Sequence, residues 1–194
     1  VAIEILTKNY PNEPLLYNIS GACYNLLGQF DAAVKSYKHA LAINPNYAEV
    51  HFNLGVTLQK LGQLDVAVNS YEQALAIKPD YAEAYYNLGI TLQKIGQLDA
   101  AVYSYSQAIA VNPNYAEAHF NLGNAYQKLG QLDAAINSYS KAVAIRANYA
   151  EAYYNLGITL QNLGQLDAAV NSFEQALAVR PDYAEVHFNL GITL

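Results

Sequence analysis

Asparagine recurs at a fixed interval of 34 residues through most of the chain, each time followed by Leu-Gly. Its side-chain amide both donates and accepts hydrogen bonds, so a row of such amides suits the backbone of an extended polypeptide. Asparagine is also a mediocre helix former, which makes its recurrence within helical sequence informative. Two alternatives remain open: copying of a repeat without selection for binding, and hydrogen bonds to a neighbouring helix. The predicted asparagine ladder consists of Asn53, Asn87, Asn121, Asn155 and Asn189.

Two further rows accompany the asparagine ladder. An aromatic residue precedes each asparagine, and a glutamine follows four of them after six positions. The aromatic row either packs against neighbouring helices or is exposed in a groove, and the glutamines either extend a polar lining or are only solvated. We include both rows in a candidate peptide-binding groove. Its aromatic members are Phe52, Tyr86, Phe120, Tyr154 and Phe188, and its glutamines are Gln59, Gln93, Gln127 and Gln161.

One repeat departs from its neighbours close to its asparagine. Asn124 and Tyr126 stand where the adjoining repeats have isoleucine and leucine. Asn124 follows Asn121 by one helical turn, so two amides are expected side by side. We predict that, if one spot of the groove is specialised, it is this one; ordinary sequence drift is the alternative.

No set of residues converges on catalysis, a metal or a cofactor. The chain has no nucleophile paired with a base and no phosphate-binding glycine loop, because every glycine belongs to the repeat. His51, His119 and His187 are 68 residues apart, and we interpret them as structural because a metal site needs ligands that converge. We therefore predict that this sequence is not an enzyme and needs no cofactor.

The elements that must position these side chains are indicated by glycine. One row, which includes Gly55 and Gly89, lies inside a helical pattern, where glycine costs about 1 kcal/mol relative to alanine, so we expect a second helix to approach closely there. The other row, which includes Gly62 and Gly96, separates two helical patterns and is expected to adopt the left-handed conformation that ends a helix. Each unit is thus predicted to be a helix of roughly 14 residues, a turn and a helix of about 13, and the fold all-α, an α-solenoid.

Helix starts are indicated by an acidic or amide residue followed three positions later by glutamate, as in Asn46 and Glu49 or Asp80 and Glu83. This is the spacing of a capping box. The recurring glutamates have a second interpretation, a bias of the groove toward basic peptides. Proline precedes most of these sites and is expected to end the previous helix, but Ala147 replaces it once.

The repeat divides the chain into a single array. The predicted units are 1–13, the end of a preceding repeat; 14–47, 48–81, 82–115, 116–149 and 150–183, five full repeats; and 184–194, the start of a sixth. The start at Val1 and the stop at Leu194 in mid-motif suggest a fragment.

These positions resemble the tetratricopeptide repeat (TPR), as in Tyr85, Leu88-Gly89, Ala101, Tyr105, Ala108 and Pro113. The resemblance implies a right-handed superhelix of stacked antiparallel helix pairs whose first helices line a concave groove for peptides or partner proteins. The repeated Asn-Leu-Gly is similar, more narrowly, to the repeat region of O-linked N-acetylglucosamine transferases and related bacterial proteins, in which groove asparagines hold a polypeptide by its backbone. The first full repeat departs from this pattern, with Ile19 at the asparagine position and Asn18 one residue earlier. The lysine and arginine clamp by which some members bind a terminal carboxylate is absent from the groove positions.

Composition limits the classes of partner. The formal net charge is −6 and no basic cluster occurs, which argues against nucleic acid, whose binding requires lysine and arginine near phosphates. Cys23 is the only cysteine, so the chain forms no internal disulfide, and reducing cytosol is favoured as its compartment. No apolar run approaches the roughly 18 residues of a transmembrane helix, so membrane insertion is not expected.

We therefore predict a protein–protein interaction scaffold that binds an extended peptide or partner protein through the asparagine ladder and aromatic contacts. Two other hypotheses remain. The array is the substrate-recruiting arm of a larger enzyme such as a glycosyltransferase, or it is a self-assembling module. The second hypothesis rests on Leu190, Ile192 and Leu194, which we expect to form an uncovered apolar face open to end-to-end stacking.

Overall fold

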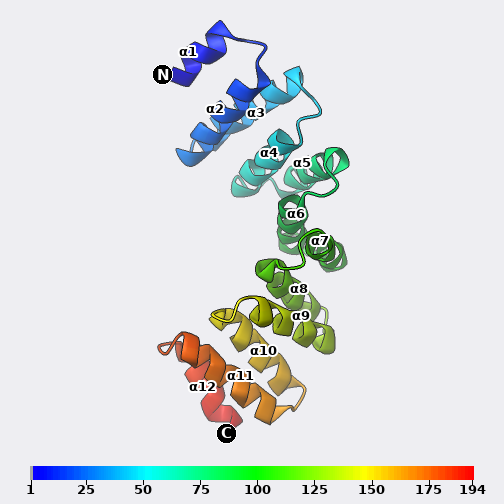
Figure 1. The fold of residues 1–194 in the computed structure, drawn as a ribbon, viewed down its shortest axis with the longest axis vertical. Helices are drawn as coiled ribbons and strands as arrows, with labels where there is room; N and C mark the ends of the chain where they lie inside the picture. Colours follow the sequence, from blue (N-terminus) through cyan, green and yellow to red (C-terminus); the bar gives the residue numbers. More distant parts are fainter. Residues whose placement is uncertain (1) are drawn as a thin grey trace. The chain divides into compact units, whose positions relative to one another are not determined.

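The computed structural model describes residues 2–194, and all regular structure in this range is helical (Figure 1). The helices therefore confirm the all-α prediction. They are α1 (Ala2–Asn9), α2 (Pro14–Leu26), α3 (Phe30–Ile43), α4 (Ala48–Lys60), α5 (Leu64–Ile77), α6 (Ala82–Lys94), α7 (Leu98–Val111), α8 (Ala116–Lys128), α9 (Leu132–Ile145), α10 (Ala150–Asn162), α11 (Leu166–Val179) and α12 (Ala184–Thr193).

The chain forms two compact units, one up to Gly96 and the other Gln97–Leu194. In the first unit, α2 packs on α3 and α4 on α5, and each pair is antiparallel (Figure 1). In the second unit, α8 packs on α9 and α10 on α11 in the same way. Within each unit, the second helix of a pair also contacts the first helix of the following pair, so the pairs stack in sequence order.

Glycine allows the two helices of a pair to approach closely, as the sequence predicts. A Cβ placed on Gly55 would lie 2.7 Å from a ring carbon of Tyr71, whose side chain is fully buried. Ala67 and Ala74 on either side of Tyr71 are also completely buried. The aromatic residue of the second helix thus fills the space that a larger first-helix side chain would need, and the same contact recurs in the pairs α2–α3, α8–α9 and α10–α11.

The turn between paired helices is made by the other glycine row. These residues have φ values between 72° and 83°, which confirms the left-handed conformation predicted from the sequence. A Cβ would meet no atom within 4 Å at any of them, so the backbone conformation, not space, requires glycine. They are Gly28, Gly62, Gly96, Gly130 and Gly164.

The predicted capping boxes are wrong. The first helices α4, α6, α8, α10 and α12 have tyrosine as the N-cap residue, with no side-chain hydrogen bond to the cap. Asn46 and Asp80 therefore lie one residue too early to act as caps. The tyrosine ring explains the shift, because Tyr81 packs against Phe52 at a centroid distance of 4.9 Å and so has its own position fixed by core contacts.

Ala147 does not extend the helix that precedes it. α9 ends at Ile145 and is followed by Arg146 in an extended conformation, whose N–H donates to the Ala142 carbonyl at 2.9 Å. α5, followed by Pro79, ends at the equivalent residue. Proline is therefore compatible with this helix end but not required for it.

Candidate functional site

The asparagine ladder lies on first helices, at half-buried positions. In the first unit, the Asn53 amide nitrogen donates to Oδ1 of Asn18 at 3.1 Å, and that of Asn87 donates to the Glu83 carbonyl at 2.8 Å. Asn18 is only 6% exposed. The first repeat therefore supplies a hydrogen-bond acceptor to the ladder from Asn18, one residue before Ile19, which occupies the asparagine position of the repeat.

In the second unit, Asn124 connects several side chains. Its Oδ1 accepts from the Tyr139 hydroxyl at 2.8 Å and from the Asn155 amide at 2.9 Å, while its own amide donates to Asn121 at 3.3 Å. The structure thus brings Asn121 and Asn124 together, as the helical spacing predicts. It also shows that the Asn124 amide is largely committed to contacts within the array.

The last asparagine of the ladder is held by two acceptors. The Asn189 amide donates to the Tyr154 hydroxyl at 3.2 Å and to the Glu185 carbonyl at 2.8 Å. Tyr154 belongs to the aromatic row, so the two rows contact one another. Ladder amides from both units are therefore oriented by hydrogen bonds to groups within the array.

The aromatic row is mainly a packing feature in the middle of the chain. Phe52, Phe120 and Tyr154 each lie 4.9–5.2 Å from the tyrosine that caps the following first helix. Tyr86 is half-buried. Phe188 on α12 differs, with 69% of its surface exposed. Along most of its length the row is therefore half-buried and in contact with a neighbouring aromatic ring.

The glutamines join consecutive repeats. Gln59, Gln127 and Gln161 donate to threonine hydroxyls of the next first helix, at 3.0, 3.3 and 2.9 Å. Gln93 is also half-buried. The sequence interpretation did not include the accepting residues Thr91, Thr159 and Thr193, although threonine in mid-helix at 34-residue spacing was a signal that could have found them.

The glutamates at the helix starts are partly neutralised by arginine, which the sequence interpretation also missed. Arg146 forms an ion pair with Glu117, and Arg180 with Glu151. Hydrogen bonding from the Arg180 guanidinium lowers the pKa of Glu151. Each arginine also stacks on the tyrosine three residues later, with Arg180 at 4.5 Å from the Tyr183 ring centre.

A lysine takes the equivalent place in the first unit. Lys78 lies 4.5 Å from the Tyr81 ring centre. Burial raises the pKa of Tyr81 to about 12, and the nearby charges of Glu49 and Glu83 add to the increase. Glu117 and Glu151 are therefore paired with arginine, whereas Glu49, Glu83 and Glu185 are exposed, so the acidic bias of this surface is weaker than the sequence suggests.

The histidines have structural contacts. Nε2 of His51, His119 and His187 donates to the carbonyl of the proline six residues earlier, at 2.9, 3.1 and 2.8 Å. Among the side chains that the structure describes, no group of three His, Cys, Asp or Glu residues is arranged to hold a metal ion. Over residues 2–194, no helix is both long and apolar enough to span a bilayer.

Family models of one kind of repeat match successive segments of the chain. Models of the TPR repeat match residues 21–62, 58–96, 94–130 and 128–164, and a tetratricopeptide repeat model matches 150–183. No curated protein sequence matches the chain.

Solved structures show the same architecture. Two crystal structures of MamA are similar, at 32% and 33% identity with TM-scores of 0.82 and 0.81; they cover 89% and 85% of this chain and 94% and 96% of their own. The structure of YrrB, described as a TPR protein with an unusual peptide-binding site, has a TM-score of 0.83 over 97% of both chains. Its identity is 21%, so that likeness concerns the fold alone.

Proposed function

The chain belongs to the tetratricopeptide repeat family, and on that premise we propose that its first helices bind an extended segment of a partner protein through the ladder asparagines. The observation that carries this proposal is the fixed orientation of the ladder amides. The amides of Asn53, Asn87 and Asn189 each donate to a group of the array, while their side-chain carbonyls accept from no residue that the structure describes. An oriented carbonyl is a ready acceptor for a ligand N–H.

Backbone recognition fits the spacing of the ladder better than a sequence code does. Packed helices lie about 8–10 Å apart, and an extended chain advances about 3.3 Å per residue, so one asparagine meets roughly every third ligand residue. Each hydrogen bond contributes only about 0.5–1.5 kcal/mol net. Affinity must therefore be summed over several repeats, and ligands of different sequence should bind.

The pairing of Arg146 and Arg180 with glutamates also supports a ligand selected by its backbone, not by its charge. A groove with unpaired glutamates along its whole length would favour basic segments. Here the neutral amides recur through the array, whereas two of the five glutamates at the helix starts, Glu117 and Glu151, are paired with arginine. We expect acidic, neutral and basic extended peptides to differ less in affinity than folded and unfolded forms of one ligand.

The test is retention of unstructured peptides with amidated C-termini by the chain and by the triple variant Asn87→Ala, Asn121→Ala, Asn155→Ala. The matched control, Asn69→Ala, Gln73→Ala, Asn171→Ala, removes exposed amides from second helices. We expect the ladder variant to bind at least about tenfold more weakly, because three hydrogen bonds are lost. Equal retention by both variants at unchanged helicity would assign the ladder a purely structural role.

The narrower resemblance to the repeat region of O-linked N-acetylglucosamine transferases remains a hypothesis, in which the array recruits substrate for a catalytic domain. Its discriminating observation is the sequence of the gene that encodes this array. A glycosyltransferase domain continuous with the repeats would support the recruiting role. Any other domain would remove it while leaving peptide binding in place.

Self-association is a second candidate function, favoured by the exposed apolar face of α12. Ile192 is 61% exposed, and a Cβ on Gly191 would meet no atom within 4 Å, unlike the equivalent Gly157, which packs on Phe173. A helix that supplied an aromatic residue would cover this face. Sedimentation at increasing concentration tests the idea, since a constant monomer mass would exclude it.

A further inference from the structure

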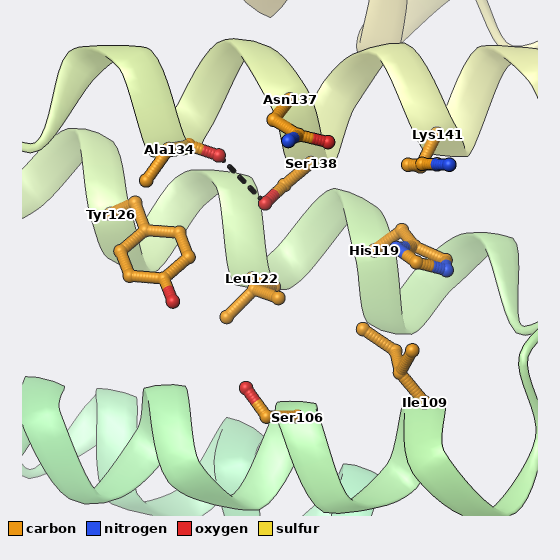
Figure 2. A pocket seen from close by; sticks show the side chains of 9 residues that line it. All are labelled: Ser106, Ile109, His119, Leu122, Tyr126, Ala134, Asn137, Ser138 and Lys141. Atoms are coloured by element: carbon orange, nitrogen blue, oxygen red, sulfur yellow. Dashed lines mark hydrogen bonds between the residues drawn. The ribbon is translucent and has the colours of Figure 1, made fainter.

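A hollow of about 330 Å³ lies over α8, between the second helices α7 and α9 (Figure 2). Leu122 and Ile109 form an apolar floor and side, and Ser106 borders the hollow on α7. Asn137 and Lys141 line it from α9, with Tyr126 at one end. Small-molecule sites occupy about 300–1,000 Å³, so this hollow has the size for a small ligand or one large side chain.

The hollow is separate from the asparagine ladder. With 3.6 residues per turn, the α8 residues that line the hollow, Leu122 and Tyr126, point about 100–140° away from Asn121 and about 160° away from Asn124. The two surfaces therefore lie on different faces of the same helix. Neither Asn121 nor Asn124 lines the hollow.

Some polar side chains around the hollow already form hydrogen bonds within the protein, and others do not. The Ser106 hydroxyl donates to the Val102 carbonyl and the Ser138 hydroxyl to the Ala134 carbonyl, both at 2.8 Å, and His119 Nε2 is bonded to Pro113. In contrast, Lys141 and Asn137 have no hydrogen-bond or ion-pair partner among residues 2–194. The available donors therefore include an ammonium and an amide on successive turns of α9.

The charge of this hollow departs from the repeat pattern. Lys141 stands where the neighbouring second helices have Gln107 and Gln175. Ser106 stands where α5 and α11 have glutamate, so an acidic side chain is absent from the border opposite the lysine. No aspartate or glutamate lines the hollow. The hollow therefore combines one unpaired cation with an apolar floor.

We infer that the hollow binds a carboxylate attached to an apolar body, with the carboxylate at Lys141 and Asn137 and the apolar part on Leu122 and Ile109. An ammonium and an amide N–H both donate to carboxylate oxygens, and a charge-assisted bond is stronger than a neutral one. The apolar floor selects against small hydrated anions such as inorganic phosphate, which leave that surface in contact with water. The ligand is either a free organic acid or the carboxylate end of a polypeptide.

The test uses 3-phenylpropanoate and its neutral amide, 3-phenylpropanamide, titrated into the isotopically labelled chain and followed by the backbone amide signals of Ser106, Asn137 and Lys141. We expect the acid to shift these signals and to bind at least about threefold more tightly than the amide, the size of a solvent-accessible charge contact. An amide that binds as tightly as the acid, or shifts confined to other helices, would overturn the inference.

The matched variant is Lys141→Gln, which gives α9 the residue that α7 and α11 carry at this position. Lys141 is exposed and glutamine is a comparable helix former, so the fold is retained. The variant should bind acid and amide equally; a persistent preference for the acid would contradict the assigned contact. A peptide ending in phenylalanine that binds more tightly than 3-phenylpropanoate identifies a polypeptide source, and the reverse order identifies a free acid.

Discussion

A Cβ on Gly157 would stand 2.5 Å from the Cε1 atom of Phe173, closer than packed carbon atoms ever approach. Phe173 is completely buried, so its ring has no free space into which it can move. The contact between these two residues sets the distance between α10 and α11. The packing of the repeating unit therefore depends on the absence of a Cβ at this glycine as much as on the aromatic side chain that occupies the space.

Gly157→Ala is expected to destabilise the chain by about 1–3 kcal/mol, the usual cost of overpacking a core, although alanine is the better helix former. Gly191→Ala on α12 is the control, because no atom lies within 4 Å of its added Cβ and the substitution should be neutral or stabilising. Urea denaturation midpoints measure both. Equal midpoints for the two variants would show that the ring of Phe173 adapts.

The bond from Gln59 to Thr91 joins α4 to α6 across a fully buried hydroxyl. Thr91→Val keeps the side-chain shape and removes the acceptor, so it should cost about 1 kcal/mol. In a Gln59→Leu background the same change should cost clearly less, because the donor is already absent. A double-mutant cycle on urea unfolding measures the coupling. Additive effects would show that the bond contributes nothing between the repeats.

The ion pair between Arg180 and Glu151 predicts a pH-dependent stability. Hydrogen bonding from Arg180 lowers the pKa of Glu151 in the folded chain, so the pair stabilises the fold above the unfolded glutamate pKa of about 4.3. That contribution is lost as the pH falls through the folded value. Arg180→Gln should therefore lower the melting temperature more at pH 7 than at pH 3. Arg180→Lys keeps the positive charge, so the change in its melting temperature between pH 7 and pH 3 should remain close to that of the unmodified chain. A pH-independent effect of Arg180→Gln would assign its role to stacking on Tyr183 alone.

The helix pairs could be predicted from the sequence because glycine acts locally. Gly62 requires a left-handed backbone and Gly55 permits close packing, and both requirements are visible from residue type and spacing. The capping prediction failed because it considered Asp80 and Glu83 without the neighbouring ring of Tyr81. Contacts between repeats fix that ring, and they take precedence over the local preference for an acidic cap.

The environment of the candidate groove was harder to predict because several of its amides have partners in other repeats. The sequence placed Asn121 and Asn124 on adjacent turns correctly, but it did not indicate that Asn155, 31 residues away, donates to Asn124. Arginine at the end of α9 similarly gave no local sign that it would reach Glu117. Side-chain pairing between helices depends on rotamers, which a repeat pattern does not specify.

Asn124 and Tyr139 form a polar pair that the next repeat replaces with Ile158 and Phe173. Asn124→Ile alone removes one acceptor from the Tyr139 hydroxyl, whose remaining acceptor is Gln127 at 3.1 Å, and should cost about 1 kcal/mol. Tyr139→Phe alone should cost a similar amount, because it removes a donor from Asn124. The double variant reproduces the neighbouring pair.

We expect Asn124→Ile with Tyr139→Phe to be more stable than either single variant, because replacing both partners of a buried hydrogen bond with apolar groups is nearly neutral. Urea unfolding of the four proteins measures the coupling. Peptide retention then separates the two interpretations of this repeat. If the spot is a specialised part of the groove, the double variant should be stable yet bind peptides more weakly. If Asn124 serves only to connect Tyr139 and Asn155, binding should persist, since Asn155 keeps its amide and no longer donates it to Asn124.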